Sequence, residues 1–313
     1  MNRIPSITWA LAALSCLTCS LSLAQQQSIA QDEDASSRQI VLDRFNKARP
    51  SGDITAGVSG ARAGATIKAP IYRRTGSLRA PGRSKSTPSS EEIGVTVWRL
   101  RPSQSTDTGG RVLVLDGFKQ SEWTPERIEA DTPLNIGDRV RLTIEAPRPG
   151  FLYIIDREQY ADGSLGDPML IFPTLHTRGG DNRVAPGKLI DIPAQEDRYS
   201  YFTAQPAGDR RDQIAEVLTI ILLTQPLNLQ IGDQPLKMTS TQVTGWEKLW
   251  GGVAERLELV GGAGRTWTNE EKQAGAAKGR QLTQTGPPPQ TVYRVARRAG
   301  GPLLVTVPLR YAR

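Results

Sequence analysis

Two apolar runs separated by a loop rich in aspartate and glycine constrain the fold of this chain more than any other feature. Phe151–Ile155 and Met169–Phe172 are apolar, and residues 156–168 between them are rich in Asp and Gly. Short apolar runs bounded by turn residues are typical of buried strands. The pattern predicts a β-rich core, and its connecting loop is the best candidate for a functional surface.

The neighbouring sequence continues the strand pattern, with Gly, Pro and Asp at the turns. Residues 139–145 alternate, so Val140, Leu142 and Ile144 share one face while the opposite face is expected to lie in water. Short strands of this kind predict a mainly β (α+β) fold, an antiparallel β-sandwich at residues 91–235, with an immunoglobulin-like arrangement left open. Further strands are expected at 94–100, 111–116, 188–192, 200–203 and 216–224.

Helical signals follow the predicted sandwich. Thr239 with Gln242, and Thr268 with Glu271, form capping-box patterns of the kind that begin helices. They predict a two-helix segment at 236–285, with one helix over 243–259 and another from 268 to about 282.

The last part of the chain returns to alternation. Residues 291–296 and 303–309 alternate and are joined by a turn containing Gly and Pro, which is the pattern of a β-hairpin. Because a lone hairpin is only marginally stable, we expect the hairpin at 286–313 to pack on the folded body.

Residues 1–24 have the pattern of a secretory signal peptide. Arg3 precedes an apolar stretch that ends in small residues up to Ala24. We therefore expect export to the periplasm or the extracellular space. Both cysteines, Cys16 and Cys19, lie within this segment, and neither follows a convincing lipobox, although a lipoprotein is left as an alternative. Cleavage after Ala24 would exclude disulfides and thiol catalysis from the mature chain.

Residues 25–90 form a basic segment that is poor in large apolar side chains. The chain carries a net charge of +7, and residues 49–90 hold eight basic residues against the single acid Asp53. Such a composition predicts a mostly disordered linker. Its charge would suit contact with an anionic cell envelope. Nucleic acid is not an expected partner, because Tyr72 is the only aromatic residue in residues 49–90 available for base stacking.

Five short motifs occur in order across the predicted sandwich. They are LNIGDRVRLTIE at 134–145, PGFLYIID at 149–156, DG at 162–163, LIFP at 170–173 and DNR at 181–183. The order resembles the bacterial domain of unknown function 4384, over roughly residues 131–227. The resemblance implies a β-rich domain that is often associated with the envelope. That family has no agreed catalytic residues, so none is transferred.

The common catalytic motifs are missing from the sequence. His176 is the only histidine, which leaves too few ligands for a typical zinc site. There is no Gly-x-Ser-x-Gly elbow, P-loop or kinase signature. We therefore predict that the protein is not an enzyme and needs no cofactor.

Calcium is the one cation that the sequence suggests. Asp156, Asp162 and Asp167 fall in or beside the acidic loop, and carboxylate oxygens are the ligands that Ca²⁺ prefers. The same acids also suit a simpler role as turn and capping residues, because Asp-Gly and Asp-Pro are turn formers.

Three functions are compatible with these observations. The leading prediction is an exported, non-enzymatic interaction or structural module of the bacterial cell envelope, which binds an unidentified envelope protein or surface ligand. One alternative is a carboxylate-based hydrolase acting on envelope polymers. The other is a calcium-stabilised binding domain.

Overall fold

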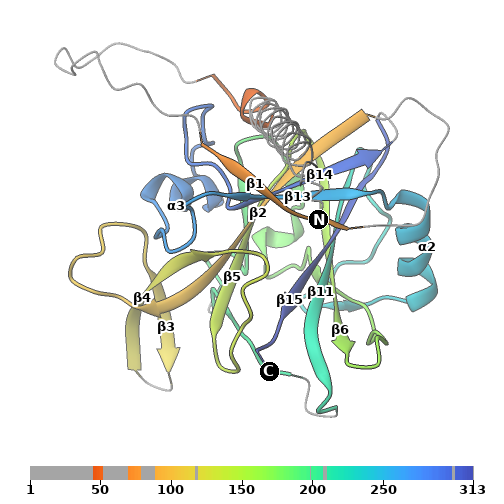
Figure 1. Cartoon of the computed structure of the whole chain (residues 1–313), viewed down its shortest axis with the longest axis horizontal. Helices are drawn as coiled ribbons and strands as arrows, with labels where there is room; N and C mark the ends of the chain where they lie inside the picture. Colours follow the sequence, from red (N-terminus) through yellow and green to blue (C-terminus); the bar gives the residue numbers. More distant parts are fainter. Residues whose placement is uncertain are drawn as a thin grey trace, which may run out of the picture.

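The computed structural model describes residues 45–51, 70–78, 89–116, 119–197, 199–206, 210–297 and 300–312, which form two antiparallel β-sheets (Figure 1). The predicted signal peptide and most of the predicted linker lie outside these residues. Within the described ranges, no helix combines the length and the apolar character that a membrane crossing requires.

The larger sheet is organised around the long strand β2 (Ser89–Pro102). One edge of β2 pairs first with β14 and then with β4, while its other edge pairs with β5. Nine strands join this sheet in the described part of the chain. The other members are β1 (Tyr72–Leu78), β3 (Val112–Asp116), β4 (Lys119–Ile128), β5 (Arg139–Glu145), β9 (Leu189–Ile192), β10 (Phe202–Thr203), β13 (Ala254–Leu259) and β14 (Thr291–Arg297).

The smaller sheet has β6 (Gly150–Tyr160) and β11 (Gln213–Leu223) at its centre. These strands pair in antiparallel register, so that Ile154 lies opposite Ile220. The predicted strands at Phe151–Ile155 and Met169–Phe172 are confirmed: the first lies in β6, and the second is its neighbour β7, in which Leu170 and Phe172 are buried. The remaining strands are β7 (Met169–Phe172), β8 (Arg183–Val184), β12 (Leu236–Lys237) and β15 (Leu303–Arg310).

The main hydrophobic core lies between the two sheets. In Figure 1, β4 and β5 lie on the left, β6 and β11 lie on the right, and β2 crosses the view diagonally from the upper right. Alternate residues of each strand point into the space between them and are almost fully buried. The antiparallel sandwich is therefore confirmed, although nine and six strands exceed the seven to nine of a whole immunoglobulin domain. The core includes Ile93, Val95, Val97, Val140, Leu142, Ile144, Leu152, Ile154, Leu218, Ile220, Leu222, Val305 and Val307.

Helix α2 (Ser240–Trp250) covers the outer face of the smaller sheet. Its Val243 is fully buried there, and the rings of Trp246 and Trp250 stack with centroids 5.3 Å apart. The helix begins at the predicted cap but ends at Trp250 instead of residue 259. Residues 251–252 are both glycine, and Ala254–Leu259 then forms β13 between β1 and β14.

The second helix and the final hairpin also differ from the prediction. Helix α3 (Asn269–Gly275) begins at the predicted Thr268–Glu271 capping box but ends about two turns earlier than expected. The hairpin prediction is wrong, because β14 pairs with β2 and β13 whereas β15 pairs with β11 in the other sheet. Alternation indicated two strands correctly but could not tell which neighbour each strand would choose.

The outer face of β5 is covered by protein, which corrects the expectation that it lies in water. Arg141, Thr143 and Glu145 are all at least 96% buried. Arg49 covers Glu145 with two hydrogen bonds, from Nε to Oε1 at 2.6 Å and from Nη2 to Oε2 at 2.7 Å.

Two parts of the predicted linker are therefore ordered pieces of the fold. The Arg49 side chain is buried and also donates to the carbonyl oxygens of Gly286 and Pro287. Strand β1 lies at the edge of the larger sheet against β13. Low hydrophobicity misled the prediction here because the first piece is held by one buried aromatic ring, Phe45, and a buried ion pair, not by a run of apolar residues.

Replacing Arg49 with Ala should lower the free energy of unfolding by about 3–5 kcal/mol, because Glu145 would be left buried without a partner. Urea unfolding followed by circular dichroism measures the loss. The matched control is Lys47→Ala, an exposed residue of the same segment, which should change stability by less than about 0.5 kcal/mol. Equal effects of the two substitutions would contradict the buried anchor.

Candidate functional site

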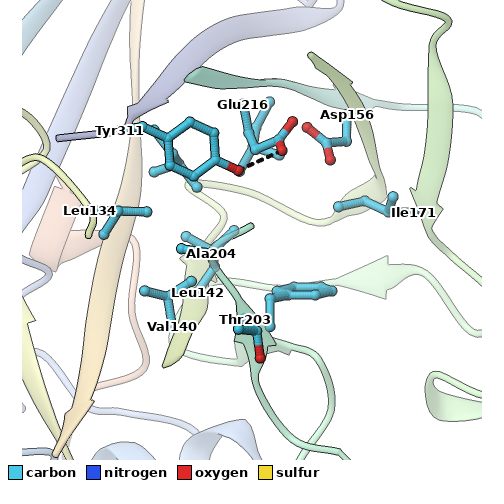
Figure 2. Close-up of a pocket in the computed structure, with 12 residues that line it drawn as sticks. Leu134, Val140, Leu142, Asp156, Ile171, Thr203, Ala204, Glu216 and Tyr311 are labelled. Carbon is cyan, nitrogen blue, oxygen red and sulfur yellow. Dashed lines mark hydrogen bonds between the residues drawn. The ribbon is translucent and has the colours of Figure 1, made fainter. Parts of the chain in front are cut away.

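A cavity of about 200 Å³ opens between the two sheets near the C-terminal end of the described chain (Figure 2). Most of its wall is apolar and comes from β5, β7, β11 and β15. Phe202 and Thr203 of the short strand β10 also line it and are exposed, so they mark its mouth. The remaining lining residues are Leu134, Val140, Leu142, Asp156, Ile171, Ala204, Glu216, Leu218, Leu309 and Tyr311.

Two carboxyl groups face this otherwise apolar cavity. The register of β6 and β11 places Asp156 opposite Leu218 and Glu216 opposite Glu158, so all four share the inner face of the sheet. Figure 2 shows the carboxyl groups of Asp156 and Glu216 pointing toward one another. The Tyr311 hydroxyl donates a hydrogen bond of 2.8 Å to Glu216 Oε1, which holds that side chain in place.

Burial changes the protonation of this pair. It raises the pKa of Asp156 to about 8, and the neighbouring Glu216 and Glu158 carboxylates add to the rise. Burial also raises the pKa of Glu216, against the lowering effect of the Tyr311 hydrogen bond. The Oδ1 atom of Asp156 is enclosed and has no hydrogen-bond partner among the described residues. Near neutral pH the pair therefore retains a proton and carries less charge than two free carboxylates.

The geometry allows this pair to receive a hydrogen-bond donor or a cation. A ligand with an ammonium or guanidinium group could replace the retained proton, while its apolar part lies against Leu142, Ile171 and Leu218. The same two groups could also act as acid and base toward a substrate.

The structure separates the three residues considered as calcium ligands. Asp156 belongs to β6, which continues to Tyr160, and not to the acidic loop. Asp162 accepts hydrogen bonds from Ser164 and lies 3.4 Å from Arg210. The bond from the Ser164 side chain is the largest factor that lowers the pKa of Asp162.

Asp167 forms an ion pair with Lys237 at 2.5 Å, away from the other two acids. In the described part of the chain, no group of three or more His, Cys, Asp or Glu side chains is arranged to hold a metal ion. His176 lies exposed in the loop after β7.

Sequence reasoning identified Asp156 but missed Glu216 and Tyr311. Glu216 stands near the start of a strongly apolar strand, and a charged residue inside such a run was a usable signal. Tyr311 comes from the end of the chain, and nothing in its local sequence indicates that it approaches β11.

The fold and the cavity define a class of protein, an antiparallel sandwich with a carboxyl-lined cavity between its sheets. Residues 133–215 match the family described as Domain of unknown function (DUF4384), and the predicted resemblance is thereby confirmed for this segment. No curated protein and no solved structure matches the chain. Eight of the twelve residues that line the cavity fall within the matched segment.

The raised pKa of Asp156 predicts that stability falls with rising pH. Below about pH 4 the carboxyl is protonated in both the folded and unfolded states, so its contribution to the free energy of unfolding is fully present. Between about pH 4 and pH 8 only the folded state keeps the proton, so the free energy of unfolding decreases as pH rises. Asp156→Asn mimics the protonated form and should remove this part of the pH dependence.

Urea unfolding at pH 5 and pH 8 measures the effect. From pH 5 to pH 8, the free energy of unfolding of Asp156→Asn should rise by at least about 1 kcal/mol relative to that of the wild type. The exposed Asp167→Asn, which also removes one carboxylate, serves as the matched control. A wild type and Asp156→Asn that respond equally to pH would disprove the retained proton.

Calcium should have little effect on stability, because Arg210 and Lys237 already compensate Asp162 and Asp167. We expect the melting temperature to be the same with saturating Ca²⁺ and with chelator. A clear rise with Ca²⁺ would instead support the calcium-stabilised domain.

Proposed function

We propose that the protein is an exported, non-enzymatic interaction module of the bacterial cell envelope. Its cavity between the sheets receives a cationic group on an apolar stem, such as a lysine side chain of a partner protein. The observation that carries this proposal is the carboxyl pair Asp156 and Glu216 at the wall of an apolar, open cavity.

The size and chemistry of the cavity support this choice of ligand. A volume of about 200 Å³ accommodates a butyl-ammonium group but not a large polymer segment. Each methylene group of the ligand stem that is buried against the apolar walls contributes about 0.8 kcal/mol to binding. A cation that displaces the retained proton also gives Asp156 Oδ1 the partner that it lacks in the described structure.

The export part of the proposal rests on the amino-terminal sequence. Residues 1–24 have the charge, apolar stretch and small residues of a signal peptide. Amino-terminal sequencing of the protein recovered from the periplasm or medium should begin at Gln25, whereas an intact Met1 would contradict export through this segment.

A second candidate function, a carboxylate-based hydrolase, is favoured by the same pair. Burial holds Asp156 protonated near neutral pH, as a general acid requires, and Glu216 stands beside it as a possible base. We rank it second because the narrow cavity offers no extended groove for a polymer.

Binding of n-butylammonium to the full chain tests the proposed function. We expect NMR shifts for residues around the cavity, with a dissociation constant of about 1 mM for so small a ligand. Glu216→Gln removes one negative charge at constant shape and should weaken binding about tenfold. n-Butanol has the same stem without the charge and should bind more weakly than the amine.

Asp167→Asn is the control variant, since this exposed acid lies outside the cavity lining. Equal binding of amine and alcohol, or unchanged binding by Glu216→Gln, would refute the cationic ligand. Turnover of purified envelope polymer that disappears in both Asp156→Asn and Glu216→Gln would establish the hydrolase instead.

A further inference from the structure

A second cavity, of about 420 Å³, lies on the opposite face of β5. Because strand side chains alternate, Val140 and Leu142 face the first cavity while Arg141 between them faces the second. Three cationic residues line it, Arg111, Arg141 and Lys272, against the single acid Asp197. The lining residues alone therefore carry more positive than negative charge, and the acids Glu122 and Asp191 lie behind Arg111 and Arg141.

Two buried donors at this cavity lack hydrogen-bond partners. Arg141 is fully buried, and neither its Nε nor its Nη2 atom makes a hydrogen bond within the described structure. Trp267 is 1% exposed, and its Nε1 atom is likewise without a partner there. The Arg141 guanidinium lies over the Trp267 ring, 4.4 Å from its centroid, so both donors belong to one cluster.

The nearest acid does not satisfy Arg141. Asp191 Oδ2 lies 3.2 Å from Arg141 Nη2, close enough for an ion pair but without hydrogen-bond alignment. Both oxygens of Asp191 already accept other hydrogen bonds, Oδ1 from Thr143 at 2.7 Å and Oδ2 from Gln195 at 2.6 Å. A buried guanidinium is costly unless acceptors surround it. Arg141 lacks such an acceptor, and a ligand can bring one.

The remaining charged groups of the site are already engaged. Arg111 pairs with Glu122, and Lys272 Nζ donates to the Arg111 carbonyl oxygen at 3.2 Å. Asp197 Oδ2 accepts from the Ala194 backbone N–H at 2.9 Å, which directs that carboxylate to its own loop. Apolar wall comes from Val112 and Leu115.

We propose that this second cavity binds a small organic carboxylate. The carboxylate accepts from Arg141 and from Trp267 Nε1, and Lys272 adds charge at the edge. The apolar body of the ligand packs against the β3 residues. Arginine suits this role because its planar group matches a carboxylate, and the tryptophan ring below holds the guanidinium in place. The site is independent of the cavity between the sheets.

Isothermal titration of the full chain with benzoate tests the proposal, with benzamide as the neutral isostere and inorganic phosphate as the anion without an apolar body. We expect benzoate to bind at least about tenfold more tightly than either comparison ligand. Trp267→Phe removes the N–H donor and replaces the indole with a smaller aromatic ring, and should weaken benzoate binding about threefold to tenfold. Arg141→Met should weaken it more than tenfold.

Arg183→Met is the control, because this exposed arginine lies outside the cavity lining and should leave benzoate binding unchanged. If Arg141→Met does not fold, Trp267→Phe and Lys272→Met carry the test. Equal binding of benzoate and benzamide overturns the proposal, as does phosphate binding as tight as benzoate. Unchanged benzoate binding in folded Arg141→Met and Trp267→Phe also overturns it.

Discussion

The structure depends on a layer of buried ion pairs on the outer face of the larger sheet. Glu145 at the end of β5 binds Arg49, and Arg127 of β4 binds Glu271 at the start of α3. Both pairs are nearly fully buried, so removing one member would leave a charge without compensation. The layer thus ties an amino-terminal segment and α3 to the same sheet, which apolar packing on the inner face could not do.

The two faces of the larger sheet therefore carry different kinds of side chain. The inner face supplies apolar side chains to the core, and the cavity forms where that packing ends near β10 and Tyr311. The outer face carries a smaller apolar cluster around Trp98 and Trp267 together with polar groups that need partners. Arg127 and Arg141 are members of that polar layer whose donors are only partly satisfied. One strand, β5, therefore contributes to both cavities through successive residues.

Much of the fold could be predicted from residue patterns, and the failures have physical causes. Strands such as 139–145 and 169–172 were predicted at their observed bounds because apolar alternation is a local property. Strand β4 was missed because its sequence is polar, and its pairing with β2 and β3 supplies the order. The site was predicted only through Asp156, since its meeting with Glu216 and Tyr311 depends on strand register and chain path.

The central claim is that a carboxyl pair enclosed in the apolar cavity keeps a proton near neutral pH. The most direct measurement is a ¹³C NMR titration of the side-chain carboxyl carbon of Asp156 in the folded protein. The account predicts that this carbon titrates with a pKa of about 8. An Asp156 carboxyl that titrates near the ordinary value of about 4 would contradict it.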